Sequence, residues 1–117
     1  MKRIINQGAQ GDVYFIRRDA IPDGYAVACP TNGKNVVAHS ETGHNHIVDA
    51  SDAILFEGPD PLVGYLRLAD GSDECAVVHQ RDYHTHETVG LGGGSGTVWE
   101  VRRQREYTSQ GLRRAQD

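Results

Sequence analysis

All six histidines of this 117-residue chain fall in two short segments that share one spacing. The first segment is His39-Ser40-Glu41-Thr42-Gly43-His44-Asn45-His46, and the second is His79-Gln80-Arg81-Asp82-Tyr83-His84-Thr85-His86. Both have the form H-x4-H-x-H. Neutral imidazole is a common ligand of zinc, iron, copper and nickel, so several imidazoles on a rigid sheet can hold such an ion. The pattern therefore predicts at least one site for a divalent transition metal, zinc or iron.

Strand geometry explains why this spacing suits a metal. Residues two apart on a strand project to the same face, so His44 and His46 would lie side by side, as would the H-x-H pair of the second segment. The intervening residues 40–43 have the length and composition of a hairpin loop, which would place His39 across from His44. Three imidazoles would then converge in each segment.

The spacing leaves open whether there is one metal site or two. Each hairpin can hold its own ion, or the two hairpins can meet and share one. In the shared arrangement the ligands are His44, His46, His84 and His86, with His39 and His79 hydrogen-bonded behind them. Neighbouring carboxylates can act as further ligands or as partners of the ring nitrogens: Glu41, Asp49, Asp82 and Glu87. A pH-sensitive histidine cluster is the alternative to metal binding.

An enzymatic site would need an open metal position and an acid or base, for which Glu87, next to His86, is the candidate. The run His84-Thr85-His86-Glu87 partly resembles the first motif of the cupins, and this resemblance implies a small metalloenzyme. Here Glu87 follows His86 directly, earlier than in that motif, and the second cupin motif is missing after Trp99. A non-enzymatic role is therefore favoured over a catalytic one.

Short apolar and β-branched segments alternate with turn signals along most of the chain. The composition, with 14 Gly and 4 Pro among 117 residues, is globular and rich in turns. These features predict an all-β fold, a small antiparallel sandwich or barrel with one domain over residues 1–107. Residues 90–96 are Gly-rich and predict a flexible loop. The predicted strands are 12–18, 25–29, 35–39, 44–49, 53–57, 63–68, 74–80 and 97–107.

The end of the chain is basic while the rest is acidic. Residues 102–114 hold five Arg and one Glu, a net +4, which leaves −8 for the remainder of a chain whose net charge is −4. Residues 108–117 are expected to form a short helix, capped by Thr108-Ser109, or an extended tail. This arm would dock on an acidic protein surface, in a partner or a second subunit, and nucleic acid is the alternative ligand. Its binding residues would be Arg102, Arg103, Arg105, Arg113 and Arg114.

The apolar runs are too short to cross a bilayer, and no apolar region follows the basic residues at the start. We therefore expect no membrane span and a cytoplasmic location. In that compartment Cys29 and Cys75 would be reduced and buried.

Several segments together resemble a group of small proteins from tailed phages and bacterial genomes. They are Gly11-Asp12-Val13-Tyr14-Phe15-Ile16, Ser40-Glu41-Thr42-Gly43-His44-Asn45-His46, the region His84–His86, and Val101-Arg102-Arg103-Gln104-Arg105-Glu106-Tyr107. The resemblance implies a phage or mobile-element origin and no particular activity. In that setting the protein partner would be a virion or assembly component, and the location the host cytoplasm or the virion.

Overall fold

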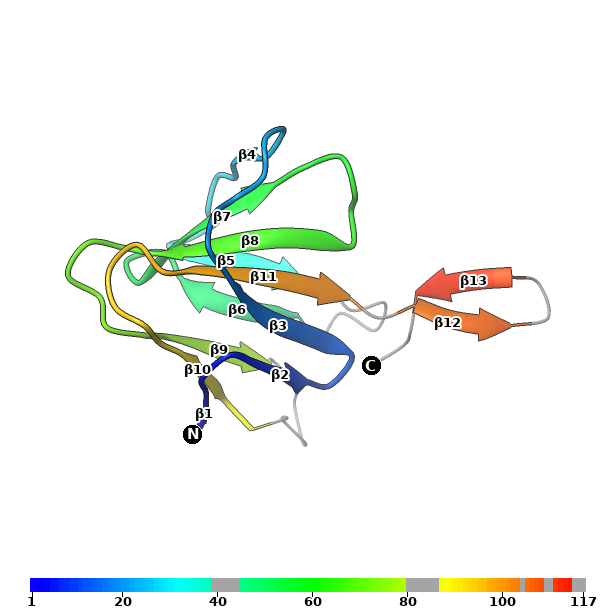
Figure 1. The fold of residues 1–117 in the computed structure, drawn as a ribbon, viewed down its shortest axis with the longest axis horizontal. Coiled ribbons are helices and arrows are strands. Elements are labelled where there is room, and N and C mark those ends of the chain that lie inside the picture. The colour runs from blue at the N-terminus through cyan, green and yellow to red at the C-terminus, as the bar shows by residue number, and fades with distance from the viewer. Residues whose placement is uncertain (39–44, 80–86, 104, 109–110, 115–117) are drawn as a thin grey trace.

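Two β-sheets packed face to face form the body of the protein, and a separate β-hairpin extends from one end (Figure 1). This is a computed structural model, and it describes residues 1–38, 45–79, 87–103, 105–108 and 111–114. Every regular element in these ranges is a strand. The predicted all-β sandwich is therefore confirmed.

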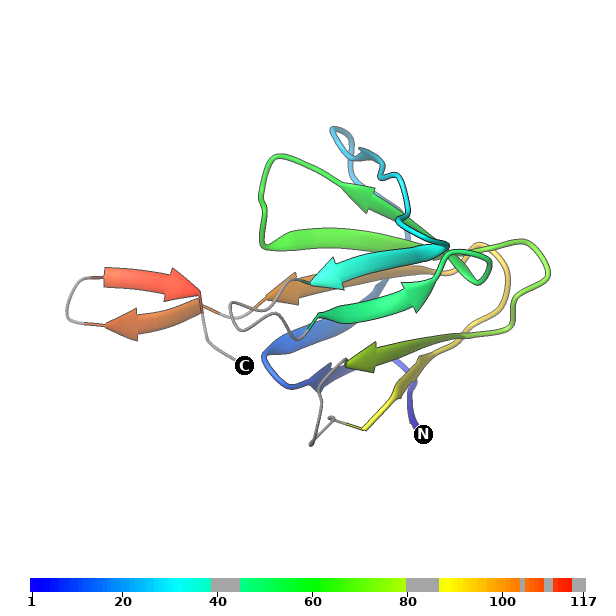
Figure 2. The same ribbon diagram turned by 180° about the vertical axis from the view of Figure 1, so that it is seen from behind.

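The first sheet has five strands in the order β1-β10-β9-β6-β5 and faces the viewer in Figure 2. Neighbours are antiparallel except for β1 and β10, which run parallel. The strands are β1 (Lys2–Ile4), β10 (Val89–Leu91), β9 (Cys75–His79), β6 (His46–Asp49) and β5 (Lys34–Ala38).

The second sheet has six antiparallel strands in the order β2-β3-β11-β8-β7-β4. Because β1 belongs to the first sheet and β2 to the second, the N-terminal segment crosses between the layers. The strands are β2 (Gln7–Gln10), β3 (Val13–Arg18), β11 (Val98–Arg103), β8 (Val63–Leu68), β7 (Ala53–Glu57) and β4 (Ala26–Val27).

Strand β10 lies partly in the segment predicted to be a flexible loop. All three of its residues are buried, and it pairs with both β1 and β9. The turn begins after it, where Gly93, Gly94 and Gly96 all have positive φ. The prediction was wrong at Gly90 and Leu91 because two neighbouring strands hold a glycine-containing segment that has little β propensity of its own.

The C-terminal segment is a hairpin and does not contain the predicted helix. Strand β12 (Arg105–Thr108) pairs with β13 (Gly111–Arg114) in antiparallel register, with Tyr107 opposite Leu112. The helix expected after the Thr108-Ser109 cap would span only residues 110–115 and contain Gly111, which is too short to be stable without a partner. Residues 105–108 and 111–114 are extended instead, which was the alternative expected for this segment.

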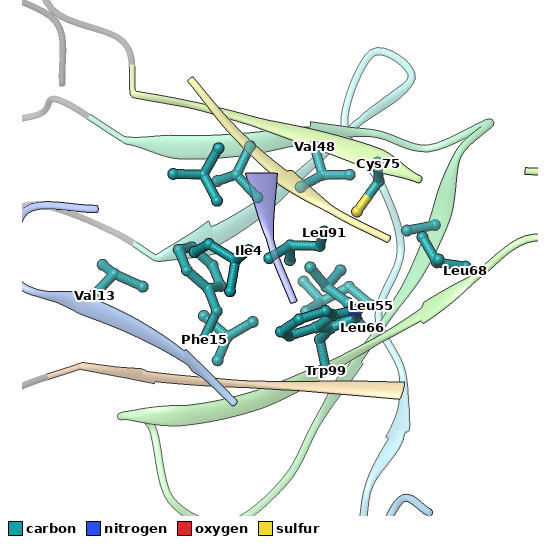
Figure 3. Close-up of a cluster of buried hydrophobic side chains, with 14 of the residues drawn as sticks. Ile4, Val13, Phe15, Val48, Leu55, Leu66, Leu68, Cys75, Leu91 and Trp99 are labelled. Atoms are coloured by element: carbon teal, nitrogen blue, oxygen red, sulfur yellow. The ribbon is translucent and has the colours of Figure 1, made fainter. Parts of the chain in front are cut away.

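The hydrophobic core lies between the two sheets (Figure 3). Alternate residues of each strand point inward, so on β11 Trp99 and Val101 enter the core while Val98 and Glu100 lie on the outer face. Trp99 is fully buried and its indole Nε1 donates to the carbonyl of Gly92, 2.9 Å away. Around it pack Phe15, Leu55, Leu66, Leu68, Val77, Val89 and Leu91.

A second apolar cluster covers the outer face of the second sheet. The connection between β3 and β4 lies over it and contributes Tyr25, whose ring meets Tyr65 edge to face at 4.8 Å. Within this cluster the Glu100 carboxylate accepts hydrogen bonds from Tyr65 at 2.9 Å and Arg102 at 3.2 Å. A buried carboxylate is tolerated here because its oxygens are paired.

No helix among the described residues is long and apolar enough to cross a membrane. Both cysteines are free, and Cys75 is buried as expected whereas Cys29 is exposed. Burial raises the pKa of the Cys75 thiol to about 12, so this side chain behaves as a small apolar residue.

Truncation of the core should cost far more than truncation of an exposed residue of similar size. Leu66→Ala, at a fully buried position, should lower the free energy of unfolding by about 2–5 kcal/mol. Ile5→Ala is the matched control, since Ile5 is 76% exposed, and should change it by less than about 0.5 kcal/mol. Urea titration followed by Trp99 fluorescence measures both, and equal losses would contradict the assigned core.

Glu100 should make the protein acid-sensitive. Burial alone would raise the pKa of Glu100, but hydrogen bonds from Arg102, Tyr65 and Arg18 outweigh it and hold the pKa below its usual value. The stabilisation is therefore complete above the unfolded-state value and is lost as the pH falls below about 4.5. Thermal melts at pH 7 and pH 3.5 should show a larger decrease for the wild type than for Glu100→Gln. An equal decrease would show that this carboxylate is not the sensitive group.

Candidate functional site

His46 and His79 meet across the pairing of β6 with β9. They are register partners, their rings stack with centroids 4.1 Å apart and planes inclined by 7°, and both side chains are fully buried. The sequence left open whether imidazoles of the two segments meet, and these two do approach each other. Two positive charges on rings this close would repel each other away from water. The stack therefore disfavours protonation of both rings at the same time.

The stacked pair marks the place where both histidine segments join the first sheet. The first segment enters β6 at His46, and the second leaves β9 at His79. Because β6 and β9 are antiparallel neighbours, these points lie at the same end of the sheet. The β5–β6 hairpin is confirmed, with Ala38 opposite His46. The remaining predicted ligands, His39, His44, His84 and His86, lie outside the described residues.

Gln10 holds His46 in place from the opposite sheet. Its Nε2 donates to the carbonyl oxygens of Val77 at 2.8 Å and Glu87 at 3.0 Å. These two bonds require the NH2 group on that side, so Oε1 is the atom that lies 2.8 Å from Nδ1 of His46. Since Oε1 can only accept, Nδ1 carries a proton.

A buried ion pair borders the histidines. Asp12 lies in the turn after β2, and its Oδ2 accepts a hydrogen bond from Arg103 Nη2 at 3.3 Å. Its Oδ1 lies 4.0 Å from Nε2 of His46. The Asp12 and Arg103 side chains are 6% and 4% exposed. Removing either partner of such a pair would leave a charge inside the protein.

The structure separates the predicted arginines. Arg103 belongs to this buried layer, while the Arg102 side chain is 52% exposed and bonds Glu100 on the outer face. Arg105 lies in β12, and Arg113 and Arg114 lie in β13. Only residues after Arg103 therefore belong to the projecting hairpin.

The described residues give a partial answer on metal binding. Outside 39–44 and 80–86, no group of three or more His, Cys, Asp or Glu is arranged to hold a metal ion. His46 shares one feature with metal-ligating histidines, a ring nitrogen that donates to a buried oxygen. Glu87, the candidate acid or base, is exposed, and its backbone carbonyl accepts from Gln10.

Gln10 and Asp12 were not predicted as part of the site. They flank Gly11, whose φ of 61° makes the tight turn from β2 into β3. A polar-Gly-polar run before a strand is typical of an exposed turn. Nothing in that pattern signals burial, which the opposite sheet imposes.

The fold and this site define a two-sheet β-sandwich with a buried layer of Gln, Asp, His and Arg closing one end of its core. The chain belongs to the family described as a domain of unknown function (DUF8820), which it matches over residues 9–104. The match runs from β2 to the end of β11 and includes every member of the buried layer. No curated protein and no solved structure matches the chain.

Loss of the Gln10 amide should destabilise the protein. Gln10→Leu keeps much of the side-chain volume but leaves the carbonyls of Val77 and Glu87 and the His46 N–H without this partner, at a cost of about 2 kcal/mol. Gln7→Leu, at the exposed start of the same strand, is the matched control and should be nearly neutral. Urea denaturation compares them. Similar midpoints for both variants would show that Gln10 does not join the two sheets.

Proposed function

We propose that the protein is a non-enzymatic metal-binding β-domain that serves as a structural component of a protein assembly. The observation that carries this proposal is the pairing of His46 with His79. The two histidine segments therefore join neighbouring strands, β6 and β9, at one end of the first sheet. An ion held by imidazoles from both segments would cross-link the two connections that contain them.

The proposed ligands come from both segments: His39, His44, His84 and His86. An imidazole set suits zinc or iron among the divalent metals. His46 and His79 are fully buried, so substrate cannot reach their rings, and a positioning role fits them better than a catalytic one. Binding free energy would then appear as folding free energy.

The assembly role is supported by the hairpin of β12 and β13. It carries three Arg and one Glu next to an otherwise acidic chain, and it pairs with none of the other described strands. An isolated two-stranded hairpin is marginally stable in water. Docking on an acidic protein surface would stabilise it, and in a phage that surface would belong to a virion or assembly component.

Metal should bind to the wild-type protein and stabilise it. With free zinc at about one hundred times its Kd, the gain is about 2.7 kcal/mol, visible as a higher Tm that EDTA reverses. Elemental analysis of dialysed protein should find metal in the wild type and not in the double variant His44→Ala with His84→Ala. The comparison should be repeated with iron under anaerobic conditions.

Thr85→Ala is the matched control, because it changes a residue between two histidines that is not a common ligand of these metals. It should retain metal and the EDTA-sensitive Tm. Equal metal content in the double variant and the wild type, or a Tm that neither zinc, iron nor EDTA changes, would contradict the proposal.

A further inference from the structure

A cleft of about 180 Å³ opens at the side of the sandwich, between edge strand β5 and the start of β8. On one wall are Val36, Val37 and Ala38 of β5. Leu55 and Leu62 supply apolar surface from the second sheet. The cleft therefore has contributions from both layers.

One hydrogen bond ties the two sheets together beside the cleft. There Asn35 Nδ2 donates to the carbonyl of Ala53 at 3.0 Å and holds β5 against β7. Ala38 and Glu57 both line the cleft beyond this bond. Among the described strands β5 pairs only with β6, so its other edge offers backbone groups to a partner.

Two carboxylates give the cleft a negative rim. Glu57 ends β7 and Asp60 lies in the connection to β8, and both residues are exposed and line the cleft. Arg103, the cation that also lines it, forms an ion pair with Asp12. A cationic segment with some apolar character would complement this surface.

The hairpin of β12 and β13, here termed the arm (residues 105–114), has that chemistry. It carries Arg105, Arg113 and Arg114 against Glu106, and Tyr107 pairs in register with Leu112. The arm begins two residues after Arg103 but leads away from the body (Figure 1). The arm therefore projects outward from the body (Figure 1), where a second copy can meet it.

We propose that the arm of one copy of this chain docks in the cleft of a second copy, and that the exchange is reciprocal. A two-fold dimer makes both contacts equivalent and closes the assembly. Ten arm residues and the cleft lining together give on the order of twenty residues per copy, near the size of a standard interface. The inference rests on the assembly part of the proposed function and not on the metal.

A charge exchange between two variants tests the proposal on the full chain. The cleft variant is Glu57→Lys, and the arm variant combines Arg105→Glu, Arg113→Glu and Arg114→Glu. Each alone places like charges together, so its dimer dissociation constant should rise at least about tenfold in analytical ultracentrifugation. Mixed in equal amounts, they should form a heterodimer, since both contacts then join opposite charges.

Asp70→Lys is the matched control for the cleft variant, because it makes the same charge change in an exposed turn between β8 and β9. It should leave the dissociation constant unchanged. Circular dichroism melts of every variant confirm that each one folds.

The proposal is overturned if the wild type is monomeric at all concentrations, if the mixture stays monomeric, or if Asp70→Lys weakens the dimer as much as Glu57→Lys. A monomer that retards DNA through its arm would assign the arm to nucleic acid and overturn it as well. Zinc and iron content measured on the same samples reports separately on the metal site. Loss of the dimer with metal retained therefore contradicts this inference alone.

Discussion

The buried amide of Gln10 is the interaction on which the end of this sandwich depends. A polar group inside a protein is tolerated only when it is paired, and this amide is satisfied entirely from the opposite sheet. It cannot move without leaving the carbonyls of Val77 and Glu87 and the N–H of His46 unpaired. The second sheet thereby fixes where β6 begins, where β9 runs and which nitrogen of His46 carries the proton.

That constraint changes the meaning of the repeated histidine spacing. The two H-x4-H-x-H segments look like copies, but β6 and β9 are antiparallel, and the buried pair is the last histidine of one segment and the first of the other. The segments therefore extend from the stack in opposite chain directions. His39 and His86 each stand seven residues from their buried partner along the chain.

Local pattern predicted the fold better than it predicted the site. Strands β7 and β8 were expected over the residues that form them, because their β-rich runs are bounded by clear turn signals. The pattern could not reveal β10, which its neighbours hold in place, or the C-terminal hairpin, where pairing overrides a weak helix signal. The sequence left the proximity of the histidine segments open, and it did not predict the buried layer. Gln10 and Asp12 resemble solvated turn residues until the other sheet covers them.

The proposed metal site and the arm depend on different parts of the chain. The buried layer that positions the histidines falls within residues 9–104, which match the family, and the arm begins at Arg105, beyond that match. Arg103 is the link, because it completes the Asp12 ion pair and also lines the cleft. Its guanidinium stabilises the layer, and its backbone ends β11 where the arm departs. Asp12 lies between His46 and Arg103, because one of its oxygens is 4.0 Å from Nε2 of His46 and the other accepts a hydrogen bond from Arg103.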